Sequence, residues 1–196
     1  MGSLRKPALS SVALALRDAL GLSTFVETGT YLGESTSWAA EHFDRVVTIE
    51  IDPDTQAKAK ATVGPRRNVA YLVGDSAETL PSVLPRLGGT SLFWLDAHKG
   101  GGHFGEGDDC PVLSELATIN SSRFAHVVFI DDARGFTAPP PDPFDPAKWP
   151  TLLQVLDAAR SKHPVDVVLF EDVLMCVPED AGPVLREAVR RVRPRL

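Results

Sequence analysis

Cysteine is scarce in this sequence, which contains only Cys110 and Cys176 among 196 residues. Cys110 precedes a proline, and Cys176 lies within an apolar run. This arrangement predicts neither a disulfide framework nor a zinc cluster. A chain without structural disulfides fits the reducing cytosol, so we expect a cytoplasmic protein.

Long hydrophobic runs are also absent. Residues 7–22 form the most apolar segment near the start, but polar side chains interrupt it, so it cannot serve as a secretory core or a membrane span. The interrupting residues are Ser10, Ser11, Arg17 and Asp18. We therefore expect a soluble protein with no membrane partner.

Basic residues are outnumbered, since 20 Lys and Arg stand against 26 Asp and Glu and the net charge is -6. A surface that binds nucleic-acid phosphates usually carries the opposite balance. The basic residues that do cluster alternate with apolar residues, as in an amphipathic helix with a solvated arginine face. They are Arg186, Arg190, Arg191, Arg193 and Arg195. Nucleic acid is therefore not an expected partner.

The hydrophobic content is 43%, which in a chain of this length supports one well-buried core and not two full-sized domains. We predict a single domain over residues 1–196 that begins with a helix at 8–22. Two segments interrupt the regular pattern, a glycine-rich loop at 99–109 and a proline-rich, extended one at 134–148. Both follow predicted strand ends, so we interpret them as lids over a substrate site.

Apolar runs alternate with helical patterns along almost the whole chain, which predicts a parallel sheet with helices on its faces. The predicted strands are 24–28, 46–51, 69–73, 91–96, 127–131, 167–171 and 173–177. The predicted helices are 11–20, 34–42, 53–63, 77–87, 111–120, 150–162 and 182–192. Only a hairpin can join the last two strands, so one of them is antiparallel. The predicted fold is α/β, a doubly wound, Rossmann-like, seven-stranded and mostly parallel sheet with a C-terminal antiparallel hairpin.

The stretch 25–36, FVETGTYLGEST, is the most informative part of the chain. An apolar run ends there in an acidic residue and passes into a turn with Gly29 and Gly33. Gly29 lets the backbone approach a ligand closely, and Gly33 precedes a helix whose amide groups face the same crevice. Glu50 ends the next strand-like run roughly 20 residues after Gly29, the spacing that places a carboxylate on a ribose. We therefore predict a bound nucleoside.

Tyr31 distinguishes between two classes of cofactor. A dinucleotide-binding turn has a glycine midway between Gly29 and Gly33, where this sequence has Tyr31. The tyrosine side chain would crowd a pyrophosphate. We therefore rank S-adenosylmethionine, which has no phosphate, above NAD. An ordinary strand, turn and helix whose glycines only allow tight packing is the alternative.

Acidic residues end most of the predicted strands. They are Glu27, Glu50, Asp75, Asp96, Asp131 and Asp132. Ligands bind outside the carboxyl ends of the strands in an open parallel sheet, so these side chains form the candidate site. Because so many carboxylates would repel one another, we assign the first three to the cofactor and the last three to Mg²⁺, which prefers oxygen ligands. The alternative is that Asp132 pairs with Arg134 and no metal binds.

Over residues 24–132 the chain resembles class I S-adenosylmethionine-dependent methyltransferases. The layout of Asp96, Asp131 and Asp132 resembles magnesium-dependent O-methyltransferases of the catechol and macrocin types. The resemblance implies that the segment VGDSAE contacts adenine and that Glu27 lies near the methionine amino group, although Asp75 or Ser76 could also cap the following helix. The cofactor-binding residues predicted in this way are Glu27, Thr28, Gly29, Tyr31, Gly33, Glu50, Asp75, Ser76 and Asp96.

A catalytic base is also expected, and two neighbouring residues compete for the role. Lys99 stands three positions after Asp96, where the related enzymes carry a lysine or histidine base, so His98 is one place early. His98 has an ordinary pKa near 6.5 and accepts a proton at neutral pH, whereas Lys99 would need a lowered pKa. We expect His98 to be the base, with Lys99 as the second candidate and His103 as the third.

The leading hypothesis is a Mg²⁺-assisted, S-adenosylmethionine-dependent O-methyltransferase that acts on a small hydroxylated molecule, such as a sugar or a natural-product intermediate. Candidate residues of the acceptor pocket, which a homodimer partner could complete, are Phe104, Phe136, Phe144 and Trp149. The alternatives are a catalytically silent cofactor-binding subunit and a metal-dependent hydroxylase or hydrolase on the same scaffold. An NAD-dependent enzyme is a more distant alternative.

Overall fold

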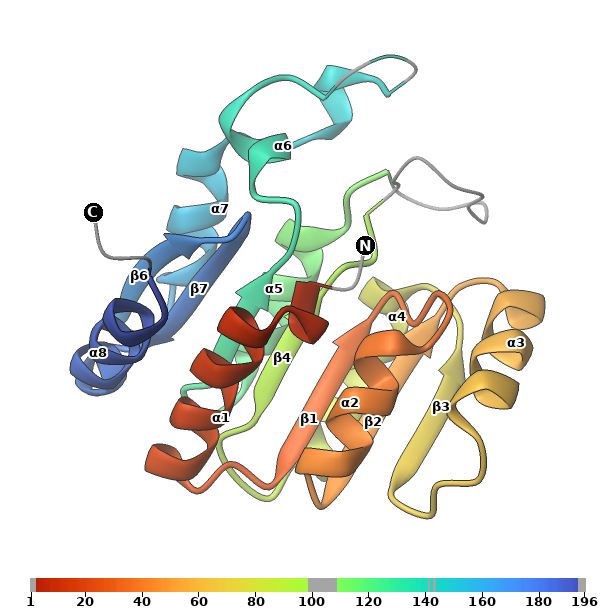
Figure 1. Ribbon diagram of the computed structural model, residues 1–196. Helices are drawn as coiled ribbons and strands as arrows, with labels where there is room; N and C mark the ends of the chain where they lie inside the picture. Colours follow the sequence, from red (N-terminus) through yellow and green to blue (C-terminus); the bar gives the residue numbers. More distant parts are fainter. Residues whose placement is uncertain (1–2, 99–108, 141, 143, 194–196) are drawn as a thin grey trace.

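A mixed β-sheet forms the centre of the protein in the computed structural model (Figure 1). The structure describes residues 3–98, 109–140, 142 and 144–193. The strands in these ranges are β1 (Thr24–Thr28), β2 (Arg45–Glu50), β3 (Val69–Val73), β4 (Leu92–Leu95), β5 (Val127–Ile130), β6 (Val165–Phe170) and β7 (Val173–Pro178). Their order in the sheet is β3-β2-β1-β4-β5-β7-β6. Strands β1 to β5 are parallel, and β7 runs antiparallel to β5 and to β6.

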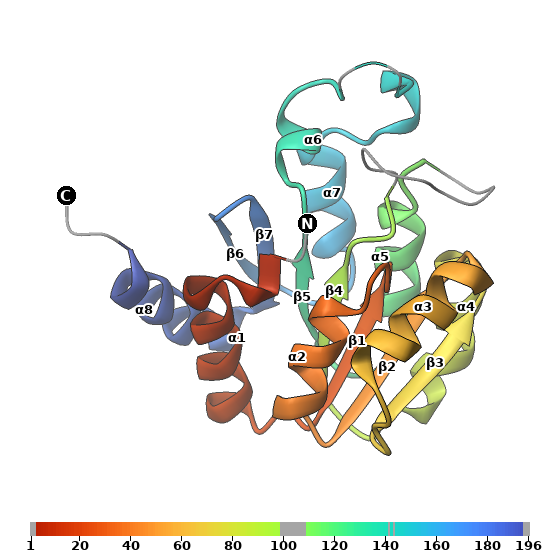
Figure 2. The same ribbon diagram turned by 45° about the vertical axis from the view of Figure 1, so that its right-hand side comes forward.

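Helices cover both faces of this sheet (Figure 2). One face carries α1 (Pro7–Leu20), α2 (Glu34–His42) and α8 (Gly182–Val192). The other carries α4 (Ser76–Val83), α5 (Val112–Ser121) and α7 (Leu152–Ala159), while α3 (Pro53–Val63) contacts β3 and α2. Short helical turns are η1 (Ser3–Arg5), η2 (Leu84–Arg86), α6 (Arg134–Thr137), η3 (Pro146–Lys148) and η4 (Glu179–Ala181). In the described part of the chain, no helix combines the length and the hydropathy of a membrane-spanning segment.

Strands β4 and β5 are apolar at every position because both of their faces are buried. In β4, Leu92 and Trp94 join the core under α1, α2 and α8, whereas Phe93 and Leu95 join the core on the opposite face. All four side chains are at most 1% exposed. Successive side chains of a strand point to opposite faces, so a continuous apolar run is the expected sequence of a strand between two helical layers. The predicted doubly wound α/β architecture is confirmed.

The C-terminal hairpin is also confirmed. Strands β6 and β7 are joined by Glu171 and Asp172 alone, and both residues adopt a left-handed backbone with φ of 52° and 68°. Two consecutive residues with positive φ are the geometry of a tight hairpin turn that matches the strand twist. The hairpin places β7 beside β5, where it ends the parallel part of the sheet.

Several predicted helix boundaries were wrong. The first helix begins at Pro7, before the predicted residue 11, because proline is well tolerated at the first helical position. Helix α4 ends at Val83, after an internal Pro81, and passes into a 3₁₀ turn. Segment 134–148, predicted to be extended, contains the helical turns α6 and η3. Helix α7 begins at Leu152, since Thr151 and Gln154 form a capping box.

Candidate cofactor and metal site

The candidate site lies where the direction of strand addition reverses, between β1 and β4. From β1 the chain adds β2 and β3 on one side, and from β4 it adds β5 on the other. Such a switch point opens a crevice outside the carboxyl ends of the strands. Gly29 occupies this point with φ of 82°, and a Cβ atom there would overlap the carbonyl oxygen of Asp96. The backbone approaches that closely only because residue 29 has no side chain.

The turn after Gly29 places a backbone N–H group next to the last residue of β2, Glu50. Tyr31 has a φ of 46°, and its N–H donates to Oε2 of Glu50 over 2.8 Å. The Asp52 N–H donates to Oε1 of the same carboxylate over 3.2 Å. Gly33 begins α2 with a φ of 78°, and a Cβ there would lie 2.8 Å from Cγ2 of Val63. Backbone conformation therefore fixes the position of the Glu50 carboxylate, as a residue that binds ribose hydroxyls requires.

Glu27 lies fully buried one strand away from Glu50. Its Oε2 accepts from the hydroxyl of Thr36 at 2.5 Å and from that of Thr48 at 2.6 Å. Its Oε1 is also buried and has no partner at hydrogen-bonding geometry among the described residues. Burial raises the pKa of Glu27, and nearby hydroxyl groups, including that of Ser35, offset part of the rise. A buried carboxylate oxygen without a partner is stabilised by a cationic group.

The end of β3 performs the capping role that was predicted for it. Asp75 is the N-cap of α4, and its carboxylate accepts from the Ala77 N–H over 2.8 Å. Ser76 follows as the first residue of the helix and is 6% exposed. Capping leaves one carboxylate oxygen of Asp75 for another donor. Contact of this element with adenine stays a prediction.

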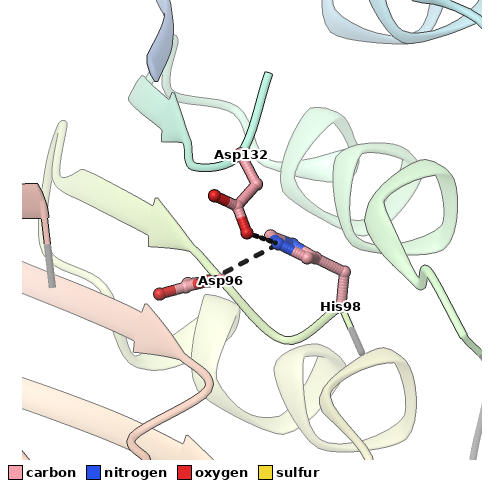
Figure 3. Close-up of side chains that lie close together, drawn as sticks. All are labelled: Asp96, His98 and Asp132. Carbon is pink, nitrogen blue, oxygen red and sulfur yellow. Dashed lines mark hydrogen bonds and ion pairs between the residues drawn. The ribbon is translucent and has the colours of Figure 1, made fainter. Parts of the chain in front are cut away.

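Asp96, His98 and Asp132 converge beyond the ends of β4 and β5 (Figure 3). Nε2 of His98 lies 3.0 Å from Oδ2 of Asp132 and 3.7 Å from Oδ1 of Asp96. Asp131, predicted to be the third metal ligand, does not belong to this group. Its carboxylate accepts from the Asp132 N–H over 2.9 Å, and it is 1% exposed. The backbone of Asp132 is left-handed, with a φ of 50°. The side chains of Asp131 and Asp132 therefore point in different directions.

The three side chains alter one another's protonation. Burial and the neighbouring aspartates raise the pKa of Asp96 to about 7, although His98 opposes the rise. Burial lowers the pKa of His98, but the hydrogen bond to Asp132 and the surrounding carboxylates outweigh it, so the net shift is upward. The same hydrogen bond lowers the pKa of Asp132, and Arg134 reinforces this shift from 2.7 Å. The cationic groups that face these carboxylates are therefore the His98 imidazole, when it is protonated, and the Arg134 guanidinium.

Aromatic side chains from segment 134–149 pack beside this cluster. The ring of Trp149 meets the His98 ring edge to face, with centroids 5.3 Å apart. Phe136 and Phe144 contact the same indole at 6.0 and 6.3 Å. A Cβ at Gly135 would lie 2.6 Å from Cζ3 of Trp149, so the backbone also packs on the ring. Three of the four aromatic residues predicted for the acceptor pocket thus lie together beside His98.

Some predicted residues lie outside the described part of the chain. They are Lys99, His103 and Phe104, together with most of the predicted lid at 99–109. The described end of that segment, Asp109, forms an ion pair with Lys148 at 3.5 Å. This pair connects the two segments that were predicted to be lids. Their role as lids stays a prediction.

Comparison with known proteins identifies the family. A profile of the methyltransferase domain family matches residues 26–133, which is more than half of the chain and includes every candidate residue from Glu27 to Asp132. The chain belongs to this methyltransferase domain family. The prediction of a methyltransferase is therefore confirmed. A search of curated proteins found no match.

Solved structures agree with the fold of this methyltransferase. The O-methyltransferase TomG from Streptomyces achromogenes is 20% identical, with a TM-score of 0.55 over 86% of this chain and 79% of its own. An O-methyltransferase from Bacillus cereus is 17% identical, with a TM-score of 0.59 over 86% and 80%. The Podospora anserina methyltransferase PaMTH1 is 20% identical, with a TM-score of 0.56 over 90% and 83%. The class I methyltransferase fold predicted from the sequence is thus confirmed.

Glu115 is a buried acidic residue near Thr28 and Ser76, two of the predicted site residues, and the sequence analysis did not single it out. It lies on α5, is 1% exposed and interacts with the side chains of Ser76 and Thr28. Burial raises its pKa, and the two hydroxyl groups and His98 offset part of the rise. The available signal was a glutamate on the apolar face of the predicted helix, between Val112 and Ile119. A charge at such a position is rare without a partner.

Proposed function

We propose that this protein transfers a methyl group from S-adenosylmethionine to a hydroxyl oxygen of a small molecule, with the assistance of a divalent metal ion. The observation that carries the proposal is the unpartnered, buried Oε1 of Glu27, next to the strand that positions Glu50. The similarity of the fold to TomG, whose structure contains S-adenosylmethionine, supports the choice of cofactor. The structure of the Bacillus cereus enzyme contains S-adenosylhomocysteine, the product of such a transfer.

The residues of the first three strands suit each part of this cofactor. The two ribose hydroxyls can donate to Glu50, whose carboxylate the turn at Tyr31 already orients. The methionine ammonium can donate to Oε1 of Glu27, which satisfies a buried acceptor. Asp75 and Ser76, at the end of β3, are the residues that we assign to the adenine ring. S-adenosylmethionine supplies an electrophilic methyl group on a sulfonium.

The other half of the proposed site concerns the acceptor. A divalent metal held by Asp96 and Asp132 would lower the pKa of an acceptor hydroxyl, because a nearby cation favours the alkoxide. Mg²⁺ is the ion predicted from the carboxylates. Trp149 and the neighbouring phenylalanines can exclude water and hold an apolar part of the acceptor. Much of the acceleration of a direct transfer comes from such alignment of the two reacting groups.

The proton of the acceptor needs a base, for which His98 and Lys99 stay the candidates. The His98 side chain is buried, and its Nε2 faces the two aspartates. The hydroxylated acceptor could be a sugar, a phenol or a natural-product intermediate. A second copy of the chain that completes the acceptor pocket also stays a prediction.

A methyl-transfer assay tests the proposal. The purified protein is incubated with S-adenosylmethionine carrying a deuterated methyl group and with a panel of catechols, sugars and hydroxylated natural products. Mass spectrometry then follows S-adenosylhomocysteine and the labelled acceptor. We expect a labelled product only from acceptors with a free hydroxyl, and none from their O-methylated analogues. Protein that binds S-adenosylhomocysteine but transfers no methyl group to any acceptor would instead support the catalytically silent subunit.

A further inference from the structure

The cluster of Asp96, His98 and Asp132 offers a nitrogen donor as well as oxygen donors. Each residue contributes one ligand atom, and the three atoms lie within 4.8 Å of one another. Ligand atoms about 2.1 Å from a shared ion stand about 3.0 Å apart in octahedral geometry and about 3.4 Å apart in tetrahedral geometry. The two distances from Nε2 of His98, 3.0 and 3.7 Å, are close to these values. The three side chains can therefore reach one ion with small adjustments.

The fold holds each of the three residues in place. The Asp96 N–H donates to the carbonyl of Thr28 over 3.0 Å, which anchors the end of β4 to β1. The His98 ring packs against Trp149, and its side chain is only 5% exposed. The side chains of Asp96 and Asp132 are 24% and 21% exposed, so the two carboxylates form the side of the cluster that is open to solvent. The imidazole is thus buried behind two partly exposed carboxylates, and further ligands would enter from the solvent side, where Arg134 now pairs with Asp132 over 2.7 Å.

We infer that His98 is a metal ligand and that this site selects a divalent first-row transition ion, such as Mn²⁺ or Co²⁺, over Mg²⁺. The catalytic purpose of the ion rests on the proposed function, but the ligand set does not. Mg²⁺ takes oxygen ligands, whereas imidazole favours transition ions. Asp131, which would complete an all-oxygen set, is not a member of the cluster, and its Oδ1 accepts from the N–H of Asp132. Two carboxylates and one imidazole thus make up the set.

If His98 is a metal ligand, the identity of the catalytic base changes. A histidine that ligates the ion through Nε2 does not accept the acceptor's proton through the same atom. The prediction of His98 as the base would then be replaced by that of Lys99. The open coordination positions beside Asp96 and Asp132 are left for water and for the oxygen of the acceptor.

Pulsed electron paramagnetic resonance on the Mn²⁺-loaded protein tests the nitrogen ligand directly. The protein is freed of metal by a chelator and then titrated with Mn²⁺ by calorimetry. We expect one bound ion per chain and a ¹⁴N modulation in the electron spin echo. His98→Glu, which supplies an oxygen in place of the nitrogen, should bind Mn²⁺ without this modulation. Bound Mn²⁺ with no ¹⁴N modulation in the wild type would overturn the inference.

Calorimetry with two metals tests the selectivity. We expect the ratio of Mn²⁺ to Mg²⁺ affinity to fall by at least about tenfold in His98→Glu, because the ligand set becomes all oxygen. His98→Ala should lower the Mn²⁺ affinity by at least about tenfold. His163→Asn is the matched control, since His163 bonds the carbonyl of Ser122 and is not part of the cluster. An unchanged ratio in His98→Glu would contradict the inference.

Binding of S-adenosylhomocysteine separates this inference from the proposed function. If the protein binds S-adenosylhomocysteine but neither metal, the metal site is refuted and the proposed cofactor stands. If the protein binds Mn²⁺ through nitrogen but not S-adenosylhomocysteine, the metal site stands and the proposed function fails. Circular dichroism of each variant shows whether it is folded, and the spectrum of the wild-type protein decides the ligand question without any variant.

Discussion

The two halves of the candidate site hold their carboxylates in different ways. On the β1 and β2 side, Glu27 and Glu50 accept hydrogen bonds from neutral hydroxyl and amide donors. On the β4 and β5 side, Asp96 and Asp132 face the imidazole of His98, and Asp132 also pairs with the guanidinium of Arg134. Neutral donors fix a carboxylate without a counter-ion, whereas two adjacent carboxylates need a cation between them.

We therefore expect the cofactor and the methyl acceptor to differ in whether their binding needs a metal ion. The cofactor half is preformed by the backbone, so it should bind its ligand with or without a metal. The acceptor half contains the unbalanced charge, so it should depend on a cation. Changes in the first half are thus expected to affect cofactor affinity, and changes in the second half to affect metal binding.

The largest effect is expected from Gly29→Ala. The added methyl group would overlap the carbonyl oxygen of Asp96 and push the two halves of the site apart. We expect S-adenosylhomocysteine to bind at least about 100-fold more weakly, as measured by calorimetry. Gly21→Ala is the matched control, because Gly21 has a φ of 63° with no atom within 4 Å of the added Cβ. Both variants carry the same left-handed strain of about 1–2 kcal/mol, so equal affinities in the two would contradict the close approach.

Glu50→Ala tests the comparison between the two halves. It should weaken S-adenosylhomocysteine binding by about 10-fold to 100-fold, since hydrogen bonds to a charged group are worth about 1.5–3 kcal/mol. Asp132→Asn should leave that affinity within about threefold of the wild type while reducing metal binding. Calorimetry measures both. A loss of cofactor affinity in Asp132→Asn as large as that in Glu50→Ala would show that the two halves are not separable.

The pH dependence of stability tests the buried carboxyl group of Glu27. Its folded-state pKa is raised above the ordinary 4.5, so between these two values the folded state binds more protons than the unfolded state. The free energy of unfolding therefore falls as pH rises through this window, by at most about 1.4 kcal/mol per pH unit. Glu27→Gln should flatten the fall in urea titrations. Glu34→Gln, at an exposed position of α2, should not change it.

The smallest effect is expected from Tyr31→Gly. The Tyr31 side chain is 52% exposed, whereas its N–H binds Glu50, so the backbone and not the ring is expected to position the carboxylate. Glycine relieves the left-handed strain at this position, which stabilises the folded protein. It also adds conformational freedom to the unfolded chain, which destabilises the folded protein. The free energy of unfolding should thus change by less than about 1 kcal/mol. A tenfold loss of S-adenosylhomocysteine affinity would instead assign a direct contact to the ring.

The cofactor half could be predicted from the sequence because its signals are local. Gly29, Gly33 and Glu50 belong to one βαβ unit, in which spacing along the chain fixes spacing in the fold. Strands β4 and β5 were found because strands buried between two helical layers have continuous apolar runs. Helix ends were harder to predict, as the early end of α4 after Pro81 shows.

The composition of the cluster on the β4 and β5 side could not be predicted from the spacing of residues along the sequence. Asp131 and Asp132 are adjacent in the sequence, but the positive φ of Asp132 sends their carboxylates to different partners. His98 joins the cluster through the packing of Trp149, which lies 51 positions later in the sequence. The position of Glu115 on the apolar face of α5 was a local signal, but its proximity to Ser76 and Thr28 was not evident from spacing. Such long-range contacts are determined by the tertiary fold.

Calorimetric titration with S-adenosylhomocysteine, in buffer that contains a chelator and then in buffer that contains Mn²⁺, tests whether the β1 and β2 side binds S-adenosylmethionine. We expect saturable binding of one molecule per chain in both buffers, with affinities within about threefold of each other, and no binding of NADH. Folded protein that binds no S-adenosylhomocysteine in either buffer would contradict the assignment of Gly29, Glu27 and Glu50 to the cofactor.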